Sequence, residues 1–72
     1  MSAGYWETFR ASAREQIESV KPSRMQLAEV SASARTIKCT LTWNGEHELT
    51  IACTAPVEQD ALRELVTMVG KL

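Results

Sequence analysis

The chain has 72 residues, of which 44% are hydrophobic and 24% are charged, and its net charge is −1. A chain this short buries only about 60% of the surface that its unfolded form exposes, so we expect one thin core in a single domain spanning residues 1–72. The small net charge excludes a global field that would recruit nucleic acid or an anionic membrane.

The first predicted element is an amphipathic helix from Gly4 to Val20. Its apolar residues recur at steps of three and four, the spacing that lines one face of a helix; they are Trp6, Phe9, Ala13, Ile17 and Val20. Lys21 stands before Pro22 and is therefore disfavoured in the α region, which ends the helix.

Basic side chains form a flank beside this apolar stripe. The flank consists of Arg10, Arg14 and Lys21, which fall together on a helical wheel, extended by Arg24. The first 38 residues hold six Lys and Arg against four Glu, whereas the remaining residues hold two against five acids. These four cations are the candidate contact for phosphates or an acidic protein. The alternative is a solvated face on which Arg14 pairs with Glu18.

Residues 23–35 fit neither a helical nor a strand period cleanly. We predict a first strand over about Arg24 to Val30. A short helix over the same residues is the alternative, favoured by Pro22 near a helix start.

Two alternating, β-branched runs between Thr36 and Cys53 predict a hairpin that turns at Asn44-Gly45. A two-residue loop would place the apolar residues of one strand on the same face as the acids of the other, which conflicts with burying one face. We therefore predict the three-residue loop Trp43-Asn44-Gly45. The expected pairs are Leu41 with His47, Cys39 with Leu49, and Ile37 with Ile51. The opposite face is expected to be rich in threonine and solvated.

The potential metal ligands and thiols lack any recognisable spacing. In the predicted register Cys39 and Cys53 lie about 13 Å apart, too far for a disulfide, so both are expected to be buried and reduced. His47 is the only histidine, and we expect it to pack at the rim of the apolar face. No zinc pattern, glycine-rich phosphate loop or nucleophilic pair is present, so we predict no cofactor, no metal and no enzymatic activity.

A second helix is predicted from the segment Thr54-Ala55-Pro56 to about Gly70. On a wheel its core face consists of Val57, Ala61, Leu65, Met68 and Leu72. A further apolar flank extends this arc, and we predict that it forms a protein interface; it consists of Leu62, Val66 and Val69. The alternative is that the first helix covers this flank. Trp43, at the hairpin tip, is expected to be partly exposed and to join the interface.

These elements predict an α+β fold of order α-β-β-β-α, in which two helices pack on one face of a three-stranded antiparallel meander. This order, the Asn44-Gly45 hairpin and the closing helix resemble the double-stranded-RNA-binding domain over nearly the whole chain. That family carries a lysine cluster at the start of its last helix. The matching positions here, residues 56–60, read Pro-Val-Glu-Gln-Asp and would repel phosphate.

The loop before the second strand also departs from that family, because residues 31–35 replace its proline- and histidine-containing loop with Ser-Ala-Ser-Ala-Arg. The resemblance therefore implies a fold without RNA binding. A fainter likeness, confined to helix, hairpin and helix, is to the small head-to-tail joining proteins of lambdoid phages.

Two functions follow from these observations. The first is a protein-binding adaptor or inhibitor, of the kind found among small phage or accessory proteins, acting on a protein partner or as a homodimer. The second is a nucleic-acid-binding module that uses the cations of the first helix. The chain shows no signal-peptide pattern and no apolar run of about 18 residues, so we expect a cytoplasmic protein without a membrane partner.

Overall fold

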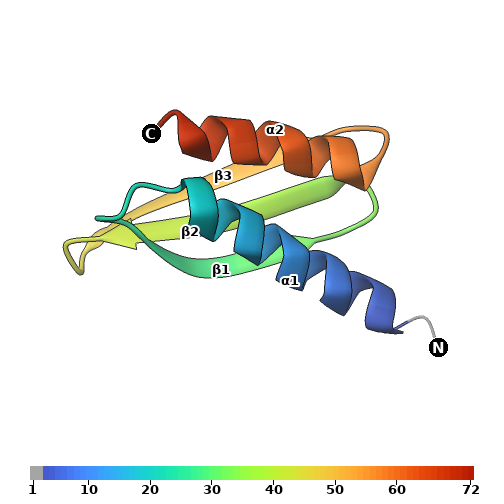
Figure 1. The fold of residues 1–72 in the computed structure, drawn as a ribbon, viewed down its shortest axis with the longest axis horizontal. Helices are drawn as coiled ribbons and strands as arrows, with labels where there is room; N and C mark the ends of the chain where they lie inside the picture. Colours follow the sequence, from blue (N-terminus) through green and yellow to red (C-terminus); the bar gives the residue numbers. More distant parts are fainter. Residues whose placement is uncertain (1–2) are drawn as a thin grey trace.

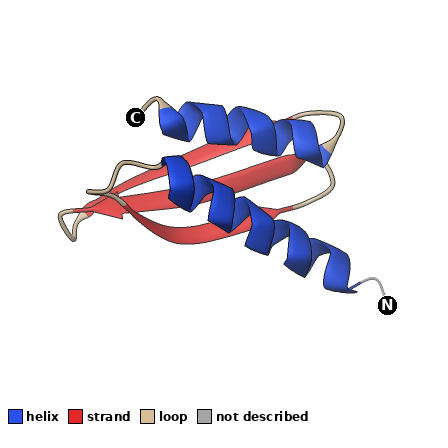
Figure 2. Cartoon of the chain, viewed as in Figure 1, coloured by secondary structure: helices blue, strands red, loops and turns tan. Residues whose placement is uncertain are grey.

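The computed structural model describes residues 3–72 and has the order α1-β1-β2-β3-α2 (Figure 1). The elements are α1 (Ala3–Val20), β1 (Gln26–Ala32), β2 (Thr36–Trp43), β3 (His47–Thr54) and α2 (Glu58–Gly70). The strands form one antiparallel sheet in the order β1-β2-β3, and both helices cover the same face of it (Figure 2). The predicted α+β fold is confirmed.

Helix α1 follows its predicted apolar stripe. Phe9, Ala13 and Ile17 are buried, because their spacing of four residues aligns them toward the sheet. The helix ends where Pro22 predicts, and the backbone N–H of Lys21 donates to the carbonyl of Ile17 at 2.9 Å.

Strand β1 settles the ambiguous segment in favour of a strand, which runs from Gln26 to Ala32. Its pairing with β2 shifts between Leu27 and Glu29, so Ala28 is an extra residue that bulges from the ladder. This outer strand therefore has an irregular edge.

The hairpin places each side chain on its predicted face, but the residue pairs predicted across it are wrong. Leu41 pairs with Leu49, and the loop is Asn44-Gly45-Glu46, closed by Trp43 opposite His47. Every pair is displaced by two residues from the prediction: Cys39 lies opposite Ile51, and Ile37 opposite Cys53. Asn44 and Gly45 both have positive φ, the conformation that type I′ turns use at their central residues.

Displacement by two residues leaves each side chain on its predicted face. Ile37, Cys39, Leu41 and Ile51 are buried as expected, while Leu49 is half-buried and His47 is exposed. The uncovered face carries threonines that bond across strands, including Thr40 with Thr50 at 3.2 Å.

Helix α2 begins later than predicted. Thr54 is still part of β3, and the backbone N–H of Ala55 donates to the carbonyl of Arg35 at 3.0 Å, which holds the segment beside the sheet. Val57 is the N-cap residue, and no side chain caps the helix. The helix ends at Gly70, as predicted.

One apolar core joins the helices to the sheet. Its largest fully buried side chains come from α1, β2 and α2; they are Ile17, Ile37, Leu41, Leu65, Val69 and Cys39. Neither helix of the described chain has the length and apolarity that crossing a bilayer would require.

Candidate protein-binding surface

The predicted interface flank of α2 faces α1. Leu62 is 6% exposed and Val69 is fully buried, so α1 and the sheet cover both side chains. Val66 is half-buried. The alternative, in which the first helix covers this flank, is confirmed for Leu62 and Val69, and these two residues are not accessible to a partner.

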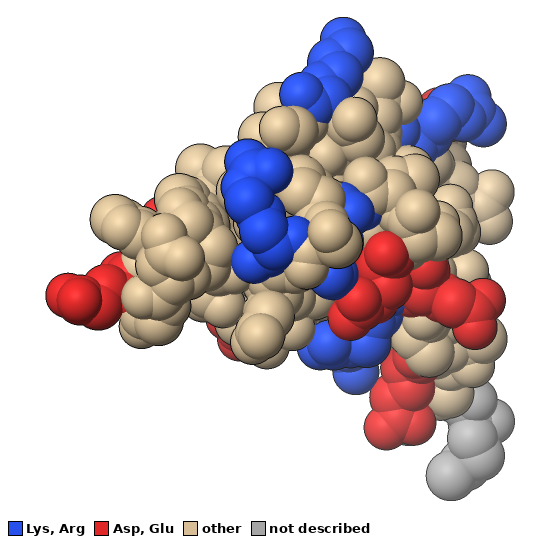
Figure 3. All heavy atoms as spheres, turned by 60° about the vertical axis from the view of Figure 1, so that its left-hand side comes forward, with Lys and Arg blue, Asp and Glu red and all other residues tan. Residues whose placement is uncertain are grey.

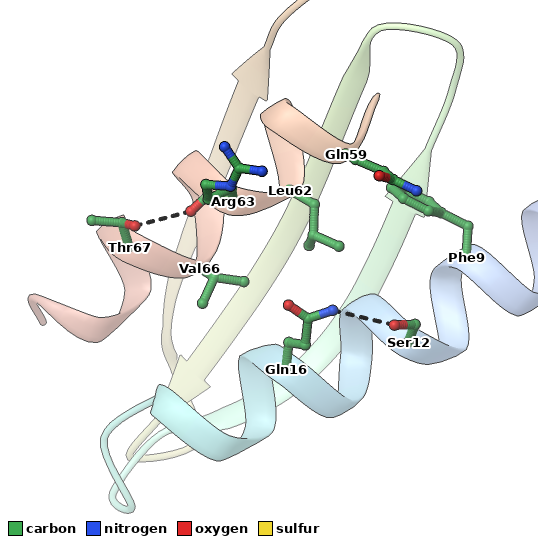
Figure 4. Close-up of a pocket in the computed structure, with 8 residues that line it drawn as sticks. All are labelled: Phe9, Ser12, Gln16, Gln59, Leu62, Arg63, Val66 and Thr67. Carbon is green, nitrogen blue, oxygen red and sulfur yellow. Dashed lines mark hydrogen bonds between the residues drawn. The ribbon is translucent and has the colours of Figure 1, made fainter. Parts of the chain in front are cut away.

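A groove of about 330 Å³ remains between the two helices (Figure 4). Leu62 and Val66 point into it from α2, and Phe9, Ser12 and Gln16 approach from α1. The amide of Gln16 donates to the Ser12 hydroxyl at 3.2 Å, within α1. Polar and apolar side chains thus share the lining of this groove.

The exposed apolar side chains of α2 lie on its other flank. Val57, Met68 and Leu72 are 49%, 46% and 43% exposed, although the wheel had assigned them to the core. Only Ala61 and Leu65 of that predicted arc are buried. The prediction was wrong because α2 is rotated toward α1. We call Val57, Met68 and Leu72 the outer stripe.

The outer stripe lies beside the free edge of the sheet. The Cys53 thiol donates to the Met68 sulfur at 3.4 Å, which places Met68 directly above β3. Among residues 3–72, strand β3 pairs only with β2, so its other side forms one edge of the sheet. Figure 1 shows α2 running along this edge, on the side away from α1.

The edge of β3 lacks most of the features that usually protect a sheet edge. Its eight residues pair without a bulge and include no proline, lysine or arginine, and Glu48 is the single acid. Proteins commonly protect exposed edges with such features, because free N–H and C=O groups otherwise pair with another chain. The opposite edge, β1, carries the bulge at Ala28.

Trp43 closes the hairpin at one end of the molecule. It is half-buried against the core, and its ring stacks on that of His47 with centroids 5.4 Å apart and an interplanar angle of 19°. Partial exposure of Trp43 agrees with the prediction. His47 thus packs on Trp43 at the rim while its own surface stays exposed.

Three of the four candidate anion-binding cations lie on α1 or directly after it, and one of these, Lys21, is engaged locally. The Lys21 ammonium donates to the carbonyl of Met25 at 2.7 Å and lies 3.5 Å from a Glu18 oxygen, so it is engaged at the end of α1. Arg24 is exposed beside Trp43, whereas Arg10 and Arg14 lie on α1. Figure 3 shows Lys and Arg side chains distributed over this face, with a group of acidic side chains among them.

The start of α2 is negative, as the departure from the lysine motif predicts. Glu58 and Asp60 lie in its first turn, and the Tyr5 hydroxyl donates a short hydrogen bond to Glu58. This bond lowers the pKa of Glu58 and raises the pKa of Tyr5. The positive end of the helix dipole stabilises both acids, and their negative charge would repel a phosphate there.

The two thiols are free and buried, as predicted, but closer than predicted. Because Cys53 pairs with Ile37 and Cys39 pairs with Ile51, the cysteines are diagonal neighbours on one face, a separation of about 7–8 Å. Burial raises the pKa of both thiols, with smaller contributions from Cys53 at Cys39 and from Glu64 at Cys53. Among residues 3–72, no three His, Cys, Asp or Glu side chains are grouped to hold a metal ion.

Comparison with protein-family models, with curated proteins and with solved structures gives no significant match for this chain. The likeness to the double-stranded-RNA-binding domain therefore rests on the order of the helices and strands.

One residue on the helical wheel of α2 already indicated that the outer stripe lies outside the core. Glu64 lies between Val57 and Met68 along the helix and about 20° beyond Val57 on the wheel, and it is exposed. A face that packs on the sheet would not carry an unpaired carboxylate there. The position of Glu64 indicates that this side of α2 lies at the margin of the core.

Proposed function

We propose that this chain is a small non-catalytic protein-binding module, of the adaptor or inhibitor class, and that it binds through the outer stripe of α2. The observation that carries the proposal is a set of three large apolar side chains, each nearly half exposed: Val57 at the N-cap of α2, Met68 in its last turn and Leu72 just beyond its end. Single exposed apolar residues are ordinary, whereas several on one side of an element favour a contact surface.

The surroundings of the stripe favour a protein partner over a nucleic acid. Three of the four nearest charges are acidic: Glu64 lies on the same side of α2, and Glu58 and Asp60 lie at its start, whereas Lys71 precedes Leu72. These carboxylates would repel phosphates and suit a partner that combines apolar and basic side chains. The Met68 side chain, which is 46% exposed, adds a flexible contact that adapts to different partner surfaces.

The test uses two variants of α2 that add the same charge at adjacent exposed residues, which lie about 100° apart around the helix. Met68→Glu interrupts the outer stripe, whereas Thr67→Glu changes an exposed residue at the inter-helix groove. Each variant is immobilised, the proteins it captures from the native host are identified by mass spectrometry, and its fold is verified by circular dichroism. We expect Met68→Glu to lose the captured proteins and Thr67→Glu to keep them. Equal capture by both folded variants would contradict the proposal.

The same samples test nucleic-acid binding. We expect no binding of RNA or DNA duplexes at low salt, where electrostatic contacts are strongest. Low-salt binding that is lost in the double variant Arg10→Ala, Arg14→Ala would favour the nucleic-acid-binding alternative instead.

A further inference from the structure

The free edge of β3 offers a row of backbone hydrogen-bonding groups. In an antiparallel sheet, every second residue of an edge strand points its N–H and C=O groups away from its neighbour. Strand β3 is eight residues long and regular, so its edge is about 27 Å long. Such an edge is suited to receive one more strand.

The sequence of β3 is compatible with pairing to itself. If two copies meet antiparallel with Ile51 opposite Ile51 of the second copy, then Leu49 lies opposite Cys53 and Thr50 lies opposite Ala52. The single acid of each strand, Glu48, then lies opposite Thr54, so no like charges face one another. Both copies also keep their core-facing side chains on the same side, which places all four helices on one face.

The position of α2 matches this arrangement. Helix α2 contacts both β2 and β3, so its axis runs between them, about 2.4 Å inward from β3. Adding a strand spacing of about 4.8 Å gives an α2-to-α2 distance of about 10 Å across the joint, which is the upper end of direct helix packing. The side of α2 that faces the joint is the one that carries Met68.

We propose that a second copy of this chain docks on the β3 edge, forming a two-fold dimer with a continuous six-stranded sheet and with the outer stripes of the two α2 helices in contact. This inference rests on the proposed function, since it uses the same stripe, and it names the partner. Backbone pairing explains why β3 lacks edge protection, and the stripe gives the joint an apolar centre.

The expected contact is small. An edge about 27 Å long and 18 Å thick presents roughly 500 Å² per copy, or about 1,000 Å² in total, which is near the lower limit for a specific interface. We therefore expect a reversible dimer that dissociates on dilution. A second copy is favoured over an extended peptide, because a bare strand would leave the stripe above the edge uncovered.

The test is sedimentation velocity of the full chain over a concentration series from about 1 μM to 1 mM. We expect a shift from monomer to dimer within this range. Met68→Glu places two acids near the two-fold axis and should raise the dimer dissociation constant at least ten-fold. Ala52→Lys places a charge on the strand edge and should also raise this constant at least ten-fold. Thr67→Glu on α2 and Ser31→Lys on β1 are matched controls that should leave the constant within two-fold.

Amide hydrogen exchange supplies a second measurement on the unmodified chain. We expect alternate amides of β3 to gain protection as the concentration rises, while those of β1 do not change. A chain that stays monomeric at 1 mM overturns the dimer. If such a chain still captures other proteins in a Met68-dependent manner, the proposed function stands without the dimer. A dimer that the folded edge and stripe variants do not weaken would also overturn this geometry.

Discussion

Leu62 provides the sharpest test of the way α2 packs, because the sequence pattern had assigned it to an outer flank. Its side chain is 6% exposed, so Leu62→Ala removes nearly the full burial of three carbon groups. At about 0.8 kcal/mol for each group, the loss is about 2.4 kcal/mol. Leu62 borders the inter-helix groove, where water can enter, so we expect a cost near the lower end of the range for buried leucines.

The matched control is Leu72→Ala, the same substitution at a leucine that is 43% exposed. By the same arithmetic we expect it to cost about 1.4 kcal/mol, because only a little over half of its surface leaves water on folding. Urea denaturation followed by circular dichroism measures both free energies of unfolding. The slope for a chain of this size is about 1 kcal/mol per molar urea, so the midpoint should fall by about 2.4 M for Leu62→Ala.

A domain of 72 residues has a total stability of about 4–11 kcal/mol, so Leu62→Ala should remain folded without denaturant unless the wild-type value lies at the bottom of this range. The measurement belongs at low protein concentration, where association does not add to stability. Midpoints that fall equally for Leu62→Ala and Leu72→Ala, or a loss below about 0.5 kcal/mol for Leu62→Ala, would refute the observed rotation of α2.

Three further predictions concern the thiols, the Tyr5 contact and the hairpin. Because burial raises the pKa of Cys39 and Cys53, their stabilising effect is complete below the unfolded thiol pKa of about 8.5 and is lost as pH rises through the higher folded value. Unfolding free energies between about pH 7 and 9.5 should therefore decline, and the double variant Cys39→Ala, Cys53→Ala should decline less; an unchanged slope would contradict this. Tyr5→Phe should return the lowered pKa of Glu58 toward its ordinary value in an NMR titration. It should also reduce the stability that the chain loses as pH falls through that pKa. An unaltered Glu58 titration would show that the hydrogen bond from Tyr5 to Glu58 does not form in solution. Gly45→Ala should lower the free energy of unfolding by about 1 kcal/mol in urea denaturation, because φ is +75° at this residue. No atom lies within 4 Å of the added Cβ, so the cost comes from the backbone and not from a clash. The control Gly4→Ala, in the first turn of α1, should not destabilise the chain, and equal effects of the two substitutions would indicate that Gly45 does not need its positive φ.

Sequence periodicity was sufficient for the fold because each strong element has a single buried face. Three of the five stripe residues of α1 are buried, whereas Trp6 is partly buried and Val20 is exposed at the end of the helix. The alternation around the hairpin separates the apolar face from the threonine face. Alternation repeats every two residues, so it rejects a register shifted by one and accepts a register shifted by two. The choice between registers two residues apart depended on the turn. Asn44 and Gly45 both have positive φ, and the loop consists of Asn44, Gly45 and Glu46, so Trp43 pairs with His47.

The candidate site was harder to predict, because an apolar arc on a helix does not state what lies on each side of it. Helix α2 has apolar residues over half its circumference, and tertiary packing decides which of them are covered. The contact with α1 buried Leu62 and Val69 and left Met68 at the sheet margin. The edge of β3 has no signal in the sequence, since an edge strand and a central strand of one open sheet share the same alternation.

The order of the strands in the sheet has a consequence for how the chain folds. Each strand pairs with its neighbour in sequence, so the whole sheet is assembled by closing two short loops, at little entropic cost. The packing of α1 on α2 alone joins the two ends of the chain. Small domains that combine helices and strands have intermediate contact orders, and their folding rates lie between those of helical bundles and all-β domains. The sheet can therefore form before the terminal helices pack on it. In that intermediate the apolar face of the sheet is exposed, which makes the intermediate the state most prone to aggregation.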